Sequence, residues 1–243
     1  MKRLRRIIVR VLVLGLAGLG ALLLYGYGRS HPQDLPWTPL DLSQPVGAFT
    51  GRKLAALVGQ GEQCRRLLER AGVRFSALAP RAPLAQCGYS DAVRFAPGGA
   101  LRLGYRPGDL GTSCPVAAAL ALWEWHVVQP AALEHFSSEV AAIEHFGSYS
   151  CRRLYGRDQG AWSEHARANA VDIGGFVLAD GRRISVARDW RDEGPRGRFL
   201  RDVRDGGCAL FATVLSPDYN RAHSDHFHFD QAERGRFGWR GCR

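Results

Sequence analysis

The sequence predicts an α+β domain behind one N-terminal transmembrane helix. Three features of the chain indicate this: an uncharged stretch near the N-terminus, two helical regions rich in Ala and Leu, and a later series of short apolar segments separated by turn residues. The chain has 243 residues, of which 46% are hydrophobic, and shows no fixed-period repeat. We therefore expect a single domain with a central antiparallel sheet flanked by helices.

The N-terminus has the pattern of a signal anchor. Five basic residues within positions 1–10 precede an uncharged stretch, 11–28, which as a helix is about 27 Å long and spans a bilayer. The positive-inside rule places residues 1–10 in the cytoplasm, so the prediction is a single-pass inner-membrane protein whose C-terminal domain lies in the periplasm. A cleaved signal peptide is the alternative, although such peptides normally have a shorter apolar region and a small-residue cleavage site.

The net charge of +10 does not indicate nucleic-acid binding. Half of the excess lies within residues 1–10, and the remaining arginines are spread along the chain instead of forming a basic stripe with aromatic residues. The expected partner at this point is the inner membrane, through residues 11–28, with no nucleic acid.

All six cysteines lie in the predicted exported part: Cys64, Cys87, Cys114, Cys151, Cys208 and Cys242. An even number in an oxidising compartment predicts three disulfides. Six cysteines allow 15 pairings, and pairing of chain neighbours is the simplest expectation because it closes the shortest loops. The expected pairs are Cys64–Cys87, Cys114–Cys151 and Cys208–Cys242.

Residues 29–50 are rich in proline and predict an extended tether, followed by the folded domain at 51–243. Apolar spacing predicts a helix over Lys53–Gly72, and Ser113 is placed to cap a second helix, Val116–Val128, which Pro130 would end. A third helix fits 197–205. Strands are expected over 140–146, 170–178, 182–187, 208–215 and 226–230, with a two-residue turn at 180–181.

Three of the eight histidines, His223, His226 and His228, lie within six residues. On a strand, His226, His228 and Asp230 share one face and the intervening phenylalanines face the core. This pattern fits a metal site and equally a solvated polar face.

A second segment, Trp162–Phe176, contains His165 and Asp172. These two residues can hold one ion only if the chain turns between them, for which 168–169 is suitable, and the alternative for Asp172 is a helix cap or an arginine partner. With one late histidine they form a two-His, one-carboxylate set, which catalytic zinc uses while leaving a fourth position for water. The remaining imidazole is then available as a base.

Longer motifs resemble known families. SEHARANAVD (163–172) and His226-Phe-His228 are similar to the Ser-x-His-x-x-Gly-x-Ala-x-Asp and His-x-His patterns of zinc peptidases that share the D-alanyl-D-alanine carboxypeptidase, murein endopeptidase and hedgehog fold. Together with GSYSCR (147–152), TSCPVAAALALW (112–123) and SPDYNRAHSDHFHFD (216–230), they resemble the bacterial extensin-like C-terminal domain family.

The resemblance implies a hedgehog- or DD-peptidase-like domain that holds Zn²⁺ through His165, Asp172 and His228. It implies His226 as the base or the oxyanion-side partner, with His223 and Arg152 as further catalytic residues; Arg152 would hold a substrate carboxylate or the oxyanion. Two features depart from the pattern, because Ala168 replaces a glycine and no Glu-x-x-His precedes the last ligand.

The implied activity is zinc-dependent hydrolysis of an amide bond in peptidoglycan stem peptides or cross-bridges. The alternative is a non-catalytic module that binds peptidoglycan or another wall polymer and retains the peptidase fold.

Overall fold

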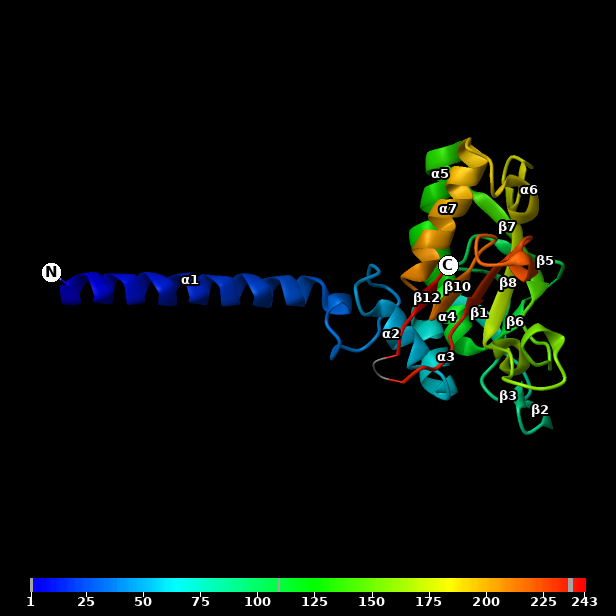
Figure 1. The fold of residues 1–243 in the computed structure, drawn as a ribbon, viewed down its shortest axis with the longest axis horizontal. Coiled ribbons are helices and arrows are strands. Elements are labelled where there is room, and N and C mark those ends of the chain that lie inside the picture. Colours follow the sequence, from blue (N-terminus) through cyan, green and yellow to red (C-terminus); the bar gives the residue numbers. More distant parts are fainter. Residues whose placement is uncertain (1, 109, 236–237) are drawn as a thin grey trace.

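The computed structural model describes residues 2–108, 110–235 and 238–243, which form one long helix followed by an α+β domain (Figure 1). Helix α1 covers Lys2–Ser30; it is long and apolar enough to cross a membrane, and none of its residues is buried. It contains the whole predicted span, 11–28, as expected for a single-pass membrane protein.

The proline-rich segment after α1 is folded, whereas an extended tether was expected at 29–50. Gln33 is buried, and the ammonium group of Lys53 donates hydrogen bonds to the carbonyl of Pro32 at 3.2 Å and to Thr38 Oγ1 at 2.8 Å. The segment therefore packs against the first helix of the domain, because its polar groups accept hydrogen bonds from the partly buried ammonium group of Lys53.

Two helices, α2 (Thr50–Ala55) and α3 (Gly61–Arg70), replace the single helix expected over Lys53–Gly72. Gly59, which lies between them, has φ of +76°. A left-handed residue cannot continue an α-helix, so the chain turns there and α3 begins in a new direction.

The second predicted helix runs further than expected. Helix α4 (Cys114–Trp123) passes through a π-helical turn, η2 (Glu124–Val128), into α5 (Gln129–Phe136). Pro130 occupies the first turn of α5, where its missing N–H is tolerated, so it does not end the helical segment.

Seven strands form the central sheet: β5 (Gly104–Arg106), β7 (Val140–Gly147), β8 (Ala170–Leu178), β9 (Arg183–Ser185), β10 (Thr213–Leu215), β11 (Phe227–Asp230) and β12 (Gly241–Cys242). Their order is β12-β10-β11-β8-β7-β5, and β9 also pairs with β8. The interior pairs are antiparallel, as expected, but β5 with β7 and β10 with β12 are parallel, so the sheet is mixed.

Two of the predicted strands are shorter than expected, because part of the first sequence is helical and the second begins with the end of a helix and a turn. Val186–Asp189 forms α6 instead of extending the strand predicted at 182–187, and α7 (Pro195–Cys208) runs on to the residue at which the strand 208–215 was expected to begin. Two smaller sheets complete the domain, β1-β4-β6 (Val73–Ala77, Val93–Gly99, Gly111–Thr112) and β2-β3 (Arg81–Leu84, Cys87–Tyr89). The mixed α+β class is therefore confirmed.

The core lies between the central sheet and helices α4, α5 and α7, which gather on one side of the domain (Figure 1). Trp123 of α4 is fully buried, its ring centroid lies 5.9 Å from that of Phe176 and 5.1 Å from that of Phe229, and its Nε1 donates to the carbonyl of Val203. One set of alternate residues of β8 and β11 thus faces the helices and leaves the other set on the opposite face.

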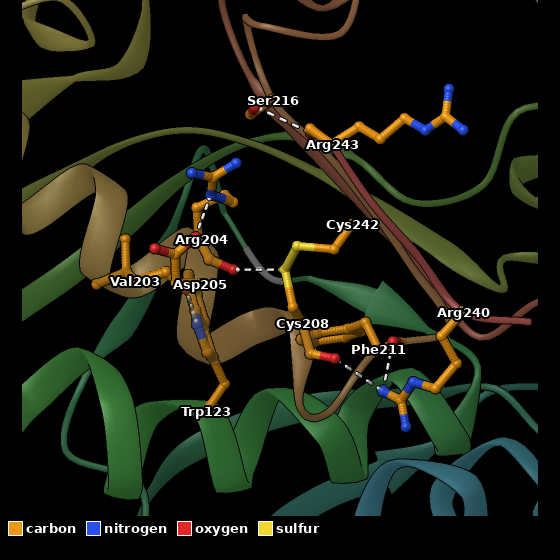
Figure 2. Close-up of a disulfide and its surroundings, with 10 residues drawn as sticks. All are labelled: Trp123, Val203, Arg204, Asp205, Cys208, Phe211, Ser216, Arg240, Cys242 and Arg243. Carbon is orange, nitrogen blue, oxygen red and sulfur yellow. Dashed lines mark hydrogen bonds and ion pairs between the residues drawn. A yellow bond between two sulfur atoms is a disulfide. The ribbon is translucent and has the colours of Figure 1, made fainter.

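All six cysteines are paired: Cys64 with Cys114, Cys87 with Cys151, and Cys208 with Cys242. The three-disulfide framework and the third expected pair are confirmed, the last joining the end of α7 to β12 (Figure 2). The expected pairs Cys64–Cys87 and Cys114–Cys151 are wrong, because tertiary packing brings α3 to the start of α4 and the β2–β3 hairpin to the segment after β7.

Candidate metal centre

The pairing of β8 with β11 builds the centre of the site. These antiparallel strands place His228 directly opposite Asp172, while the next pair, Phe229 and Val171, is fully buried in the core. Side chains alternate across a sheet, so the imidazole and the carboxylate share the face that points away from the helices. The predicted alternation in 226–230 is thereby confirmed.

His165 reaches the same point from the short 3₁₀ helix η4 (Glu164–Arg167), which precedes β8. Ser163 accepts a hydrogen bond from the backbone N–H of His165 at the start of this helix, and Ala168 follows it with φ of +53°. This left-handed residue turns the chain between His165 and Asp172, at the position where the sequence suggested a turn.

Three ligand-type atoms converge as a result. His165 Nε2 lies 3.2 Å from Asp172 Oδ1 and 3.1 Å from His228 Nδ1, and His228 Nδ1 lies 3.0 Å from Asp172 Oδ1. Ligands about 2.0–2.1 Å from a tetrahedral zinc ion lie about 3.3 Å apart, so these spacings fit one ion. Of the described residues, this is the set of histidine, cysteine and carboxylate side chains close enough to share a metal.

The opposite ring nitrogens show why these atoms need a cation. His165 Nδ1 donates to the carbonyl of Ser148 at 2.7 Å, and His228 Nε2 donates to Asp230 Oδ2 at 3.2 Å. With those N–H groups directed outward, His165 Nε2 and His228 Nδ1 both face the Asp172 carboxylate. These three atoms can be in contact only with a proton or a metal ion among them. Such outer partners are typical of metal-bound histidines.

The electrostatics agree with this inference. Burial acts to raise the pKa of Asp172, but hydrogen bonds with His165 and His228 outweigh burial and hold that pKa well below its usual range. Burial likewise acts to lower the pKa of His228, and its hydrogen bonds with Asp172 and Asp230 overcome this and raise the pKa to about 9. The cluster therefore attracts a proton or a metal ion strongly.

His226 and His223 lie beside the three ligand-type residues. His226 Nε2 is 3.6 Å from Asp172 Oδ1, and its Nδ1 is held by Asp225 at 2.7 Å. His223 pairs with Asn220 through Nδ1 at 2.8 Å, and its ring centroid lies 5.3 Å from that of His226. Burial, followed by the neighbouring positive charges, lowers the pKa of His223 to about 4, so this imidazole is neutral at pH 7.

Arg152 lies at the edge of the cluster. Its side chain is exposed, and its charge is one of those that depress the pKa of His223. The preceding residue, Cys151, is fixed to β3 by its disulfide with Cys87. The arginine is therefore carried on a restrained segment with its guanidinium toward solvent.

Comparison with known proteins assigns the chain to a family. Residues 62–243, which include every residue of the site, match the extensin-like protein C-terminus. The chain belongs to the extensin-like family. No curated protein and no solved structure gives a significant match.

The side chains of the cluster in the extensin-like domain differ in exposure. The side chain of His165 is only 4% exposed, whereas the side chains of Asp172, His226 and His228 are 12–14% exposed. His165 forms the floor of the site, and the other groups are within reach of a solvent molecule or ligand.

Two supporting residues of the extensin-like domain were not assigned roles from sequence. Asp230 could have been found, because it lies two residues after His228 on one strand face. The Ser148 carbonyl could not, because its contact with His165 depends on how the end of β7 packs against η4. Asp172, by contrast, has three imidazoles as ion-pair partners instead of the arginine considered from sequence.

The turn between His165 and Asp172 uses an alanine in an unusual conformation. Ala168 adopts the left-handed conformation that glycine favours. Its carbonyl accepts hydrogen bonds from Thr112 and Ser148, and the Ser113 N–H donates to it as well. These contacts hold the turn despite the alanine side chain.

Proposed function

We propose that the extensin-like domain is a zinc-dependent hydrolase that cleaves an amide bond in peptidoglycan peptides. The observation that carries this proposal is the convergence of His165 Nε2, Asp172 Oδ1 and His228 Nδ1. The opposite nitrogen of each ring is held by a hydrogen bond, to the Ser148 carbonyl for His165 and to Asp230 for His228. Two histidines and one carboxylate leave a fourth position for a reacting group.

The residues around that position have suitable chemistry. A zinc ion held by His165, Asp172 and His228 would supply a Lewis acid that can polarise a carbonyl and make water more acidic. His226, oriented by Asp225, is placed to accept the proton of the attacking water and to return it to the leaving amine. Neutral His223, beside it, donates its Nδ1 proton to Asn220, so its Nε2 is placed to accept a hydrogen bond from the substrate or from the attacking water.

The rim of the site suits a peptide that carries a carboxylate. Arg152 offers an exposed guanidinium. Phe146 is 63% exposed with its ring against His226, and Tyr219 packs its ring against His223. Similarity of the site motifs to those of the zinc peptidases with the hedgehog and DD-peptidase fold supports the same reaction class.

The proposed location is the inner membrane, with the domain in the periplasm. Basic residues precede the apolar part of α1, and three disulfides follow it, as expected when the N-terminus stays in the cytoplasm and the domain is exported. Retention of the full-length chain in carbonate-washed membranes supports the anchor, whereas a shortened soluble form would establish a cleaved signal peptide.

Two histidine substitutions test the activity. His228→Ala should lose zinc and cleavage together, because it removes a ligand. His226→Ala should keep about one zinc per chain and slow the release of peptide fragments from sacculi roughly 10²–10⁴-fold. His126→Ala is the matched control, since His126 is exposed on η2 and belongs to no part of the cluster, and it should change neither quantity.

The same assay separates the enzyme from a wall-binding module. Purified protein is incubated with whole sacculi, with and without a chelator, and released fragments are analysed by mass spectrometry. If the wild type binds sacculi and zinc but releases no fragment from any cross-link type, the domain is a binding module that retains the metal site.

A further inference from the structure

A second polar site lies at the end of the domain that adjoins α1. A cavity of about 640 Å³ opens beside α2, where residues 232–235 and 238–240 lie next to this helix (Figure 1). We call this the membrane-proximal cavity; its charged lining residues are Arg52, Lys53, Glu233, Arg234 and Arg240. Within the described part of the chain, none of its four basic side chains has a carboxylate at ion-pair distance.

Backbone carbonyl groups hold the side chain of Arg240 in this cavity. Its guanidinium donates to the carbonyls of Cys208 and Phe211, beside the disulfide to Cys242 (Figure 2). A Cβ on Gly51 would lie 1.9 Å from Arg240 Nη1, so the approach of the guanidinium requires glycine there. Carbonyl partners leave its charge uncompensated, and the charge of Arg52 repels it. The cavity is therefore prepared for an anion.

The chain that leaves α1 leads directly to this cavity. Tyr27, near the end of α1, donates its hydroxyl to Asp34 at 2.7 Å, and Asp34 in turn accepts the backbone N–H of Ala48. The adjoining residues Pro36 and Phe49 are part of the cavity wall. With residues 11–28 in the bilayer, these contacts hold the cavity close to the membrane surface.

Exposed tryptophans lie on the same side of the domain. Trp37, next to Pro36, is 77% exposed, and Trp239, which lines the cavity, is 64% exposed. The guanidinium of Arg234 lies 4.7 Å from the ring centroid of Trp239. Tryptophan is enriched where proteins meet the headgroup region of a membrane, and clustered basic residues are attracted to its anionic lipids.

We propose that the membrane-proximal cavity and its two tryptophans form a docking surface for anionic phospholipid headgroups, with a lipid phosphate held between Arg52, Arg234 and Arg240. Docking would add a direct contact with the bilayer to the contacts of residues 27–48, which already hold the domain near its anchor. The inference requires α1 to cross the membrane and is independent of the chemistry at the metal centre.

Tryptophan quenching in proteoliposomes tests the proposal. The full-length protein is reconstituted into vesicles whose phospholipids carry bromine near the headgroup, either neutral phosphatidylcholine alone or phosphatidylcholine with one third phosphatidylglycerol. We expect stronger quenching in the anionic vesicles, a decrease at high salt because exposed charges are screened, and loss of the additional quenching in Trp37→Phe/Trp239→Phe.

Charge reversal identifies the residues responsible. Arg52→Glu/Arg234→Glu should abolish most of the additional quenching, because removing each basic residue weakens association with an anionic surface about fivefold. The control is Arg188→Glu/Arg198→Glu, which makes the same change in charge at exposed positions of α6 and of the first turn of α7; neither residue lines the cavity. A thermal unfolding midpoint shared by all variants shows that they fold.

Two results would overturn the proposal: equal quenching in neutral and anionic vesicles, or equal loss of quenching in the two charge-reversed proteins. A single variant, Arg52→Gln, covers the case in which Arg234→Glu disturbs folding, since Arg52 is exposed and its guanidinium lies over the ring of Phe49. It should lower the additional quenching partially.

Discussion

Two carboxylates, the partly buried Asp172 in β8 and the fully buried Glu124 in the π-helical turn after α4, have pKa values that are shifted in opposite directions. Asp172 faces imidazoles, which keep its pKa far below the usual range. Glu124 is fully buried, and burial raises its pKa from 4.5 to about 7, although one oxygen accepts the backbone N–H groups of Arg102 and Leu103. Its other oxygen has no hydrogen-bond partner among the described residues.

The difference between the two carboxylates lies in their partners. Two backbone N–H groups donate to one oxygen of Glu124, but they carry no positive charge that would stabilise the carboxylate. Burial therefore favours the neutral acid there. Asp172 stays ionised because its partners can become cationic or can share a metal. A buried carboxylate with imidazole partners and an open side therefore marks the functional region, and one with backbone partners marks the core.

The largest expected effect concerns metal binding. Asp172→Asn should weaken zinc affinity more than about 100-fold, because it removes the negative charge and one ligand atom from the set. Glu124→Gln, an equivalent change at the other carboxylate, should keep about one zinc per chain. Elemental analysis after dialysis measures both, and a full zinc complement in Asp172→Asn would contradict the assigned site.

The next effect concerns stability against pH at Glu124. Since its pKa in the folded state is raised, the unfolded chain releases this proton first, and the stability contribution present below pH 4.5 is lost as the pH rises to about 7. The loss amounts to at most about 3 kcal/mol. Asp172 acts in the reverse sense, because its lowered pKa stabilises the fold above its usual pKa and this contribution is lost on acidification.

Urea unfolding at pH 5 and pH 8 measures this contribution. Glu124→Gln should keep the hydrogen bonds from residues 102 and 103 and should lose less stability than the wild type between the two pH values. An unchanged difference between pH 5 and pH 8 would show that Glu124 titrates normally in the folded protein.

A smaller effect is expected from the support of His228. Asp230→Asn should lower zinc affinity about 10–100-fold, because the charged acceptor that orients the ring is replaced by a neutral one. Competition with a fluorescent chelator measures the affinity. Asp225→Asn is the matched control, since Asp225 contacts His226 and not a ligand; it should preserve affinity and slow cleavage.

The smallest effect is expected at the turn between the ligands. Ala168→Gly relieves the left-handed strain at φ of +53° but removes a buried methyl group and makes the unfolded chain more flexible. These contributions oppose each other, so the free energy of unfolding should change by less than about 1 kcal/mol and zinc should be retained. Loss of zinc from this variant would show that the methyl group itself positions His165.

Local sequence determined several features because they depend on neighbouring residues. Strand β8 has the predicted bounds, 170–178, and β7 differs from its predicted range by one residue. The alternation of His226 and His228 with phenylalanine fixed which residues of β11 face the core. The uncharged stretch at 11–28 was sufficient to predict α1.

Long-range packing decided the rest. The register of β8 with β11, which brings His228 opposite Asp172, joins segments more than 50 residues apart. The disulfide pairs Cys64–Cys114 and Cys87–Cys151 follow from the positions of elements that share no local signal.

The Ser148 carbonyl and the membrane-proximal cavity depend on tertiary structure in the same way. Sequence periodicity specifies the face of an element on which a side chain lies, since the backbone repeat is local. The partner across that face depends on how the whole core packs, and only the tertiary structure determined it.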